Sequence, residues 1–395
     1  MITRYSRPEM RAIWTDENKL KTWLQIELLA SEALVKEGVV PRKDFAKIKA
    51  GCDKWFADLP GLVARQKELD IDVRREVRTT GDLVKLGPMD QEALARRPIE
   101  EFIPRSIQER RAEFIRGETA GTLGKPKYAV HRRDEFEAAF VEPFVVAAQR
   151  AGFPRGLNWL FIGPSGPHII GKAANACAQA MGSPDCFTID FDPRWAKKLP
   201  PGSFAWQRYV AHLEDQALTI VNSQNIGVLF STPVLLENLG RRMTSPQRGA
   251  VRGLHLGGLA VSAAQRSVFQ RLFPEAVILS GYGNTLFGMM PELAYSDHDG
   301  FSYYPHGHRL IVRVVALEGG ADRDRLGGEL DRGQRGQVVL SRLDETQLIV
   351  NLMERDSAVR CSPPSGAMSD GFLQDGLRDP QPIISPTVKP AVGLY

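Results

Sequence analysis

Residues 157–182, LNWLFIGPSGPHIIGKAANACAQAMG, hold the pattern that decides the fold. An apolar run, LNWLFIG, is followed by a short turn and then by a longer run rich in alanine and isoleucine. A short continuous apolar run is typical of a strand that is buried on both faces, whereas the second run has the length and composition of a helix. The stretch therefore predicts one strand–turn–helix unit of a parallel sheet.

The same order of elements recurs further along the chain. The apolar run at residues 225–233 precedes a helical pattern at 234–243, and RGLHLGG at 252–258 precedes a helical pattern at 262–273. A further strand-like run, EAVILSGYG, follows at 275–283. This alternation predicts an α/β fold with layers of helices around a mostly parallel sheet.

The pattern changes after residue 303. Residues 308–318, 335–343 and 347–353 read as strands of hairpins, with DRGQRG (331–336) as a turn. The segment 362–395 is rich in proline, glycine and serine, which predicts a loop or tail.

The N-terminal segment is predicted to be helical. Thr15 is a candidate N-cap, apolar residues follow at helical spacing, and Gly38 with Pro41 ends the pattern. Residues 4–41 resemble the N-terminus of adenylosuccinate lyases. No later stretch matches the signature loop of that family, so lyase chemistry is disfavoured. We expect residues 1–79 to form a helical appendage that serves packing or dimerisation.

The composition excludes several classes of protein. Fifty-one basic residues against 47 acidic residues give a net charge of +4, which is too even to indicate nucleic-acid binding. The four cysteines form no CxxC pair, so a zinc ribbon or a disulfide framework is not expected. No apolar run approaches the roughly 18 residues of a membrane span, and the N-terminus lacks the apolar run of a signal peptide. We therefore expect a cytoplasmic protein without a membrane partner.

The stretch GETAGTLGKPK (117–127) is the strongest candidate for a ligand-binding loop. Glycine lets successive backbone N–H groups converge on an anion, and threonine hydroxyls and a lysine add donors and charge for a phosphate. A Walker A loop is excluded, because Thr119 and Pro126 stand where it requires glycine and serine or threonine. On composition alone, an ordinary flexible loop explains the stretch equally well.

A resemblance favours the phosphate loop. ETAGTLGKPK resembles the Ser/Thr/Gly-rich loop of the adenylate-forming superfamily of acyl-CoA synthetases and luciferase-like enzymes, most closely the phenylacetate–CoA ligase branch. Four further motifs follow in the order of that family, within residues 164–182, 254–262, 280–292 and 335–357. The resemblance covers roughly residues 80–380. It implies an adenylate-forming core at 80–361, with layered, mostly parallel sheets and a β-hairpin subdomain, and a truncated hinge at 362–395.

The resemblance also implies the cofactors ATP and Mg²⁺ and a role for each matching residue. Lys127, Thr119 and Thr122 would be catalytic groups on the phosphates. His168 and Gly166 would lie near the acyl group of the substrate. The nucleotide would be held by loop glycines, by the adenine-binding motifs and by the ribose-binding aspartate: Gly121, Gly124, Gly257, Gly258, Tyr282, Gly283, Asn284, Thr285 and Asp356.

Two departures from the family pattern bear on the activity. The glutamate that helps to hold Mg²⁺ is replaced by Leu286, which leaves Glu292 as the expected metal ligand. The small C-terminal domain of the family, with its lysine, has no counterpart, although Arg378 stands at the place of the hinge arginine. An aromatic-acid pocket could use Phe161, Phe187, Trp195 and Phe230, although such residues are more often core.

The resemblance predicts ATP-dependent activation of an aryl or acyl carboxylic acid as an acyl-adenylate, with release of pyrophosphate. Transfer of the acyl group is expected to need an acceptor or a partner protein, and a homodimer is the expected assembly. The alternative is a catalytically weakened protein that binds nucleotide or acyl groups, which Leu286 favours.

Overall fold

The computed structural model describes residues 15–60, 77–89, 91–119, 126–196, 198–200, 202–319 and 321–383. The chain divides into two units, Met1–Lys85 and Leu86–Tyr395. The boundary predicted after residue 79 lies close to this division.

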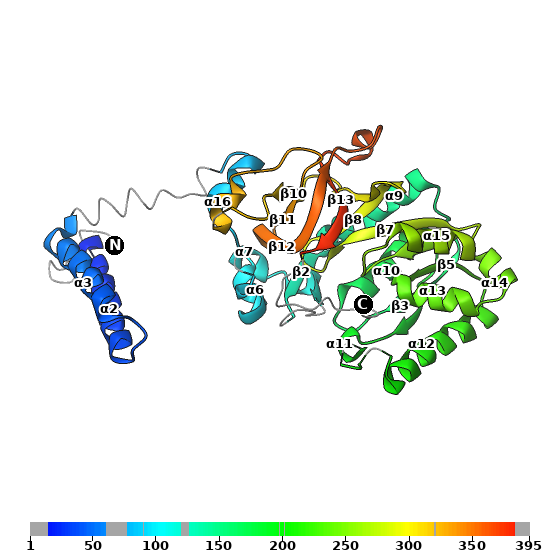
Figure 1. Cartoon of the computed structure of the whole chain (residues 1–395), viewed down its shortest axis with the longest axis horizontal. Helices are drawn as coiled ribbons and strands as arrows, with labels where there is room; N and C mark the ends of the chain where they lie inside the picture. Colours follow the sequence, from blue (N-terminus) through cyan, green and yellow to red (C-terminus); the bar gives the residue numbers. More distant parts are fainter. Residues whose placement is uncertain are drawn as a thin grey trace. The chain divides into compact units, whose positions relative to one another are not determined.

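The first unit contains two helices that pack on each other, α2 (Asp16–Lys36) and α3 (Arg42–Ala57) (Figure 1). The Thr15 side chain caps α2 by accepting a hydrogen bond from the Asn18 N–H at 3.1 Å, as expected from the sequence. Gly38, with φ of 73°, lies just after the helix, where a left-handed residue ends it. The predicted N-terminal helix is therefore confirmed in its described part. A 3₁₀ helix, η2 (Thr80–Leu86), spans the division between the units.

The second unit is built on one sheet of eleven strands, whose order is β10-β11-β12-β13-β9-β8-β7-β6-β5-β3-β4. The strands of one half run parallel: β3 (Asn158–Gly163), β4 (Phe187–Asp190), β5 (Ile226–Ser231), β6 (Gly253–Leu256) and β7 (Val277–Asn284). The predicted α/β fold with a parallel sheet is thereby confirmed.

Helices cover both faces of the parallel half (Figure 1). Because side chains alternate along a strand, Trp159 and Phe161 of β3 pack on one face, whereas Leu160 and Ile162 pack on the other. The first face carries α9 (Glu142–Ala151) and α10 (Ile169–Ala180). The opposite face carries α12 (Phe204–Ser223), α13 (Pro233–Arg242) and α15 (Ala263–Leu272). Two short helices, α11 (Pro193–Ala196) and α14 (Ser245–Ala250), lie in the connections.

The hairpin strands continue the same sheet in antiparallel pairing. They are β8 (Gly288–Ser296), β9 (Gly300–Tyr303), β10 (Leu310–Val315), β11 (Arg335–Leu343), β12 (Leu348–Cys361) and β13 (Gly376–Pro382). The segment that we predicted to be a loop-like tail thus contributes β13, which lies between β12 and β9, and the prediction is wrong for those residues. Helices α16 (Asp322–Leu326) and η6 (Met368–Asp370) lie in the connections between these strands.

A separate two-stranded sheet carries the candidate phosphate loop. Strands β1 (Phe114–Glu118) and β2 (Tyr128–Arg132) pair antiparallel, and the loop lies at the end where Glu118 faces Tyr128. The Glu118 N–H donates to the Pro167 carbonyl at 3.0 Å, which fixes the hairpin beside the start of α10. The hairpin is preceded by α6 (Ala93–Arg96), η3 (Ile99–Phe102), α7 (Arg105–Gln108) and η4 (Arg111–Glu113), and is followed by α8 (Arg133–Phe136) and the π-helical η5 (Glu137–Val141).

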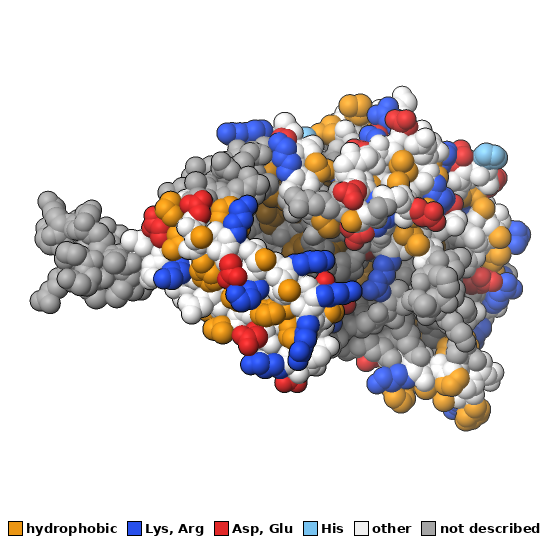
Figure 2. Space-filling view, turned by 60° about the vertical axis from the view of Figure 1, so that its left-hand side comes forward, with side chains coloured by type: hydrophobic (Ala, Val, Ile, Leu, Met, Phe, Trp, Pro, Cys, Tyr) orange, Lys and Arg blue, Asp and Glu red, His pale blue; other side chains and the backbone are white. Residues whose placement is uncertain are grey.

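The surface mixes charges of both signs. On the face shown in Figure 2, Lys and Arg side chains share the surface with Asp and Glu, as the balanced composition predicts. In the described part of the chain, no helix has the length and apolar character needed to cross a membrane.

Candidate functional site

The carboxyl ends of β5, β6 and β7 open onto a cavity of about 600 Å³, which also borders the β1–β2 hairpin and β12. This edge is where ligands usually bind in open α/β sheets, and the volume is typical of a small-molecule site. Eight of the predicted catalytic and nucleotide-binding residues line the cavity: Thr119, Lys127, Gly257, Gly258, Gly283, Asn284, Thr285 and Asp356. The structure therefore brings together residues that are up to 237 positions apart in the chain, from Thr119 to Asp356.

The base of the candidate phosphate loop is closed by two hydrogen bonds. The Thr119 N–H donates to the Lys127 carbonyl at 2.9 Å, and the Lys127 N–H donates to Thr119 Oγ1 at 3.0 Å. These bonds orient two of the three predicted catalytic residues, Thr119 and Lys127, at the mouth of the loop. Gly121, Thr122 and Gly124 lie outside the described residues, so their roles stay predictions.

The Lys127 side chain is held at the cavity wall. Its Nζ donates to Gln91 Oε1 at 2.7 Å, and Gln91 in turn donates to the Met353 carbonyl. Burial lowers the pKa of Lys127, and the nearby Glu354 carboxylate opposes this shift. The ammonium group is thus placed where a polyanion entering the cavity would meet it.

Two carboxylates on β12 form an acidic side of the cavity. Asp356 accepts a hydrogen bond from the Tyr282 hydroxyl at 2.7 Å, and Glu354 accepts one from Asn284 Nδ2 at 3.1 Å. Burial raises the pKa of both carboxyls; the Tyr282 hydrogen bond opposes the shift of Asp356, and the Lys127 charge opposes that of Glu354. Burial also raises the pKa of Tyr282 well above its usual range. Glu354 was not predicted from the sequence.

Two glycines allow the backbone to approach this cavity closely. Gly258 has φ of 78°, a conformation that side chains with a Cβ rarely adopt. At Gly283, an added Cβ would lie 2.0 Å from the Gly288 carbonyl oxygen on the neighbouring strand. Glycine at 283 is therefore required by the close pairing of β7 with β8.

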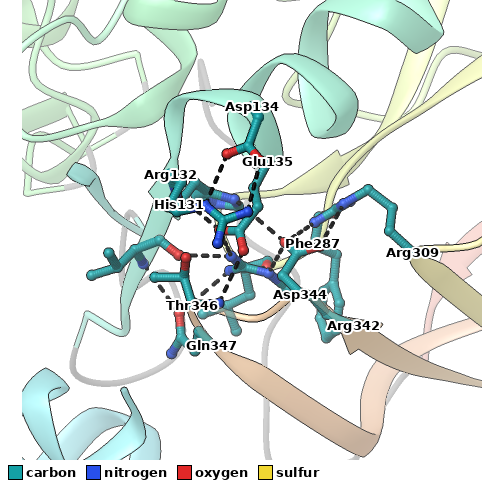
Figure 3. A network of polar contacts seen from close by, with 12 residues as sticks. His131, Arg132, Asp134, Glu135, Phe287, Arg309, Arg342, Asp344, Thr346 and Gln347 are labelled. Carbon is teal, nitrogen blue, oxygen red and sulfur yellow. Dashed lines mark hydrogen bonds and ion pairs between the residues drawn. The ribbon is translucent and has the colours of Figure 1, made fainter. Parts of the chain in front are cut away.

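The turn after β7 is fixed by a buried polar network (Figure 3). Arg342, which is fully buried, donates to the Leu286 carbonyl at 3.1 Å and to the Val130 carbonyl at 2.6 Å, and it pairs with Asp344 at 2.5 Å. On the same turn, His131 Nε2 lies 3.1 Å from the Thr285 carbonyl. Burial lowers the pKa of Arg342 to about 10. Of these network residues, Thr285 was predicted as part of a site, whereas Arg342, Asp344 and His131 were not.

The network continues outward from Asp344. Arg309 binds both oxygens of Asp344, at 3.0 and 2.6 Å, and also donates to the Phe287 carbonyl at 2.6 Å. Glu135 accepts from the Thr346 N–H and the Arg132 N–H, each at 2.9 Å. Strand β2, the β7–β8 turn and the β11–β12 connection are therefore tied together directly behind the cavity.

The predicted acyl and metal residues lie off the cavity wall. His168 is the N-cap residue of α10 and is buried beside Glu118, and Gly166 lies in the preceding turn. Glu292 is buried, and its oxygens accept from Arg266 at 3.0 Å and from the Ser280 N–H and hydroxyl at 2.9 and 3.0 Å. Burial raises the pKa of Glu292, against the charge of Arg266.

A metal site built from protein carboxylates is not evident. The described residues contain no cluster of three or more His, Cys, Asp or Glu side chains that could hold a metal ion. The Thr285 hydroxyl already donates to the Glu118 carbonyl at 3.2 Å, and Leu286 packs into the main core. The role of Glu292 in binding Mg²⁺ stays a prediction.

The opposite end of the cavity is apolar. Of the four aromatic residues proposed for an acid pocket, Phe230 lines the cavity, and Phe161 packs behind it with ring centres 5.1 Å apart. Trp195 is half exposed, and Phe187 packs against the main core. His255, which the sequence suggested only as part of a strand, also lines this end.

No protein-family model matches the sequence. Adenylosuccinate lyases match a short N-terminal part: the Bacillus subtilis enzyme is 61% identical over 73 residues, which are 18% of this chain and 16% of that enzyme. The Streptococcus mutans enzyme is 53% identical over 53 residues, 13% of this chain and 12% of that enzyme. The chain thus spans about a sixth or less of these relatives, and the N-terminal resemblance is confirmed for that part alone.

Two solved structures cover a larger part of the chain. 2-Hydroxyisobutyryl-CoA ligase in the postadenylation state, in complex with R3-HIB-AMP, has a TM-score of 0.52 at 13% identity and covers 76% of this chain and 58% of that one. Mycobacterium smegmatis MbtA has a TM-score of 0.43 at 11% identity, covering 68% of this chain and 46% of that one. The likeness to 2-hydroxyisobutyryl-CoA ligase shows that the α/β core shares the fold of that ligase; the phenylacetate–CoA ligase branch stays a prediction.

Proposed function

We propose that residues 86–395 activate a carboxylic acid, aryl or acyl, with ATP, forming an acyl-adenylate and releasing pyrophosphate. One observation carries this proposal: a closed loop base with a lysine, the Asp356 carboxylate held by Tyr282 from behind the wall, and a glycine turn meet at one cavity, at the carboxyl edge of the parallel strands. Each group has the chemistry that one part of ATP requires.

The nucleoside part of ATP is proposed to lie at the acidic side of the cavity. The Asp356 carboxylate offers acceptors for the two ribose hydroxyls, and bonds to an ionised acceptor are stronger than neutral ones. The Tyr282 hydroxyl, 2.7 Å from Asp356, holds that carboxylate in place. The positive φ of Gly258 lets the backbone approach the adenine ring without a side chain between them.

The phosphates are proposed to lie against the hairpin. Lys127 supplies a positive charge at the loop base, and Thr119 supports the backbone that carries it. The substrate carboxylate attacks the α-phosphorus; a P–O bond forms while the bond to the pyrophosphate oxygen breaks, and the pyrophosphate leaves with the electron pair. A carboxylate is already ionised at neutral pH, so no general base is needed, and catalysis rests on positioning and on charge stabilisation.

The donor set does not fit an Mg²⁺ ion held mainly by the protein. Glu292 is engaged by Arg266 and Ser280, and no carboxylate cluster is found among the described side chains. Because Mg²⁺ commonly binds through substrate phosphates and retained waters, dependence on Mg²⁺ would enter with the nucleotide.

ATP–pyrophosphate exchange tests this proposal. We expect exchange that depends on an added aryl or aliphatic acid and on Mg²⁺. The rate of exchange should fall in Lys127→Met. The control is Lys49→Met, at an exposed lysine of the first unit, in which ATP binding should be unchanged. Tight ATP binding without exchange for any acid would contradict the proposal and favour the second candidate, a nucleotide- or acyl-binding protein. The burial of Leu286, where the family pattern has a glutamate, is the observation that favours that candidate.

The acceptor of the acyl group, a partner protein for the transfer step, a homodimer and a cytoplasmic location stay predictions from the sequence. The substrate is a small-molecule carboxylate in this proposal, and nucleic acid has no part in it.

A further inference from the structure

The side-chain amide of Gln91 joins three separate segments at the wall of the cavity. Gln91 lies in the turn before α6, Lys127 lies directly before β2, and Met353 lies on β12. Lys127 Nζ donates to Gln91 Oε1 at 2.7 Å, and Gln91 Nε2 donates to the Met353 carbonyl. Gln91 and Lys127 both line the cavity. One side chain therefore fixes the lysine that is proposed to meet the phosphates.

The chemistry of the two partners leaves this amide a single orientation. An ammonium group only donates hydrogen bonds, and a backbone carbonyl only accepts them. The amide oxygen must therefore face Lys127, and the amide nitrogen must face Met353. Among the described residues, Lys127 Nζ has no second hydrogen-bond partner, so two of its three N–H groups are available to a ligand.

The carboxylate of Glu354 is the group that would compete for this lysine. Glu354 lines the same cavity, and the charges of Lys127 and Glu354 favour each other's ionised form. Arg355, the next residue of β12, also lines the cavity, and its charge opposes the ionised form of Lys127. No hydrogen bond or ion pair joins Lys127 to Glu354 in the part of the chain that the structure describes. The two opposite charges thus interact across the cavity without contact.

A second amide holds the carboxylate. Asn284 Nδ2 donates to Glu354 Oε1 at 3.1 Å. Asn284 Oδ1 accepts from the N–H groups of Leu286 and Phe287 at 2.9 and 3.2 Å, so this amide also has a single orientation. Opposite charges attract more strongly where water is partly excluded, and without these amides the ammonium and the carboxylate would pair. Each of the two charges is therefore held by its own amide.

We infer that Gln91 is a positioning residue for Lys127: it keeps the ammonium group open to an incoming phosphate and out of contact with the Glu354 carboxylate. This inference rests on the proposed function for the identity of the ligand, because that function places the phosphates of ATP against Lys127. The position of Lys127 itself can be measured without a ligand. Loss of the Gln91 amide should let Lys127 pair with Glu354.

Gln91→Met tests the inference on the full chain, because methionine keeps the length of the side chain and removes both hydrogen bonds. ATP binding, measured by calorimetry, should weaken about tenfold, and the rate of ATP–pyrophosphate exchange should fall by a similar factor. In the background of Glu354→Gln the competing carboxylate is absent. The effect of Gln91→Met on ATP binding should there shrink to about twofold. An effect of the same size in both backgrounds would overturn the inference.

Gln108 offers a matched control in the segment before the hairpin. Its amide donates to the carbonyls of Glu100 and Ile103, at 3.0 Å each, and Gln108 does not line the cavity. Gln108→Met should lower the melting temperature about as much as Gln91→Met and leave ATP binding unchanged. An equal loss of ATP binding in Gln108→Met would show that any lost glutamine contact disturbs the site, and would overturn the role of Gln91.

Carbon-13 NMR of labelled lysine side chains gives a reading that a structural role alone would not move. The Lys127 resonance is assigned by its absence in Lys127→Met. In Gln91→Met the pKa of Lys127 should rise by about one pH unit through the new ion pair with Glu354. An unchanged or lower pKa would overturn the inference. Gln91→Asn, whose side chain is one carbon shorter and cannot reach both partners, has the same expected result and replaces Gln91→Met should that variant not fold.

The outcome separates this inference from the proposed function. A raised pKa of Lys127 in Gln91→Met, without ATP–pyrophosphate exchange for any acid in the unchanged protein, would support the role of Gln91 and contradict adenylation. Exchange that Gln91→Met leaves unaffected would support adenylation and overturn the role of Gln91.

Discussion

Replacing Arg342 with methionine should strongly destabilise the 86–395 unit. The guanidinium is fully buried and donates to the Val130 and Leu286 carbonyls, and it pairs with Asp344. Methionine has a similar length, so little packing is lost, but two buried carbonyls lose their donor and a buried carboxylate loses one of its cations. Removing one member of a buried ion pair typically costs about 3–5 kcal/mol, and we expect a loss of this size in the free energy of unfolding.

Arg332 offers a matched control in the same unit. It also pairs with an aspartate, Asp375, at 2.8 Å, but its side chain is 63% exposed. Because exposed ion pairs contribute little, Arg332→Met should leave the free energy of unfolding nearly unchanged. Urea titration followed by pulse proteolysis would measure the free energy of unfolding of both variants, read from the gel band of the fragment that contains residues 86–395. Equal effects in the two variants would refute the argument that burial makes the Arg342 contacts stabilising.

Three other changes have defined outcomes. Lys127→Met should lower the rate of exchange by about 10²–10³, as the loss of other charge-stabilising groups does, and its absence of effect would exclude Lys127 from the phosphate site. The pKa of His255 is about 3 in the fold and 6.5 when unperturbed, so the unfolded chain alone binds this proton as the pH falls below 6.5. The contribution of His255 to the free energy of unfolding should therefore fall by about 2 kcal/mol between pH 8 and pH 5. The urea midpoint should accordingly depend less on pH in His255→Asn than in the unchanged protein. Gly283→Ala should cost about 1–3 kcal/mol, because its Cβ would meet the Gly288 carbonyl, whereas Gly249→Ala, in open space on α14, should be neutral or stabilising; melting temperatures compare the two.

The parallel half of the sheet could be predicted because its strands are buried on both faces. Such strands appear as short apolar runs such as residues 157–163, each followed by a helical pattern, and local sequence is enough to detect them. Strand β13 could not be predicted in this way. Its sequence, GLRDPQP, is polar and contains two prolines, and its strand conformation comes from pairing with β12, the preceding strand, and with β9, which is remote in the chain.

The residues of the candidate site also differ in whether the local sequence predicts them. Lys127 and Asp356, which line the cavity, could be predicted because they lie in motifs whose order could be compared with a family, whereas Tyr282, predicted in the same way, packs against the main core beside Asp356. His255 was missed because a histidine in an apolar run is usually a core residue, and only the structure shows that this residue lines the cavity. Arg342 was missed because its burial is decided by strands that are remote in sequence; the only local signal is an arginine within the apolar run 338–343.

The buried network explains how scattered motifs form one site. The hairpin that carries the loop and the turn that follows β7 do not merely lie near each other: the Thr285 hydroxyl binds the Glu118 carbonyl, and Arg342 binds carbonyls of both Val130 and Leu286. A displacement of either segment would break charge-assisted bonds in a dry environment, where they cannot be replaced by water. The loop base and the turn after β7 are therefore positioned as a single body, and variants that weaken Arg342 should disturb both ends of the proposed ATP site together.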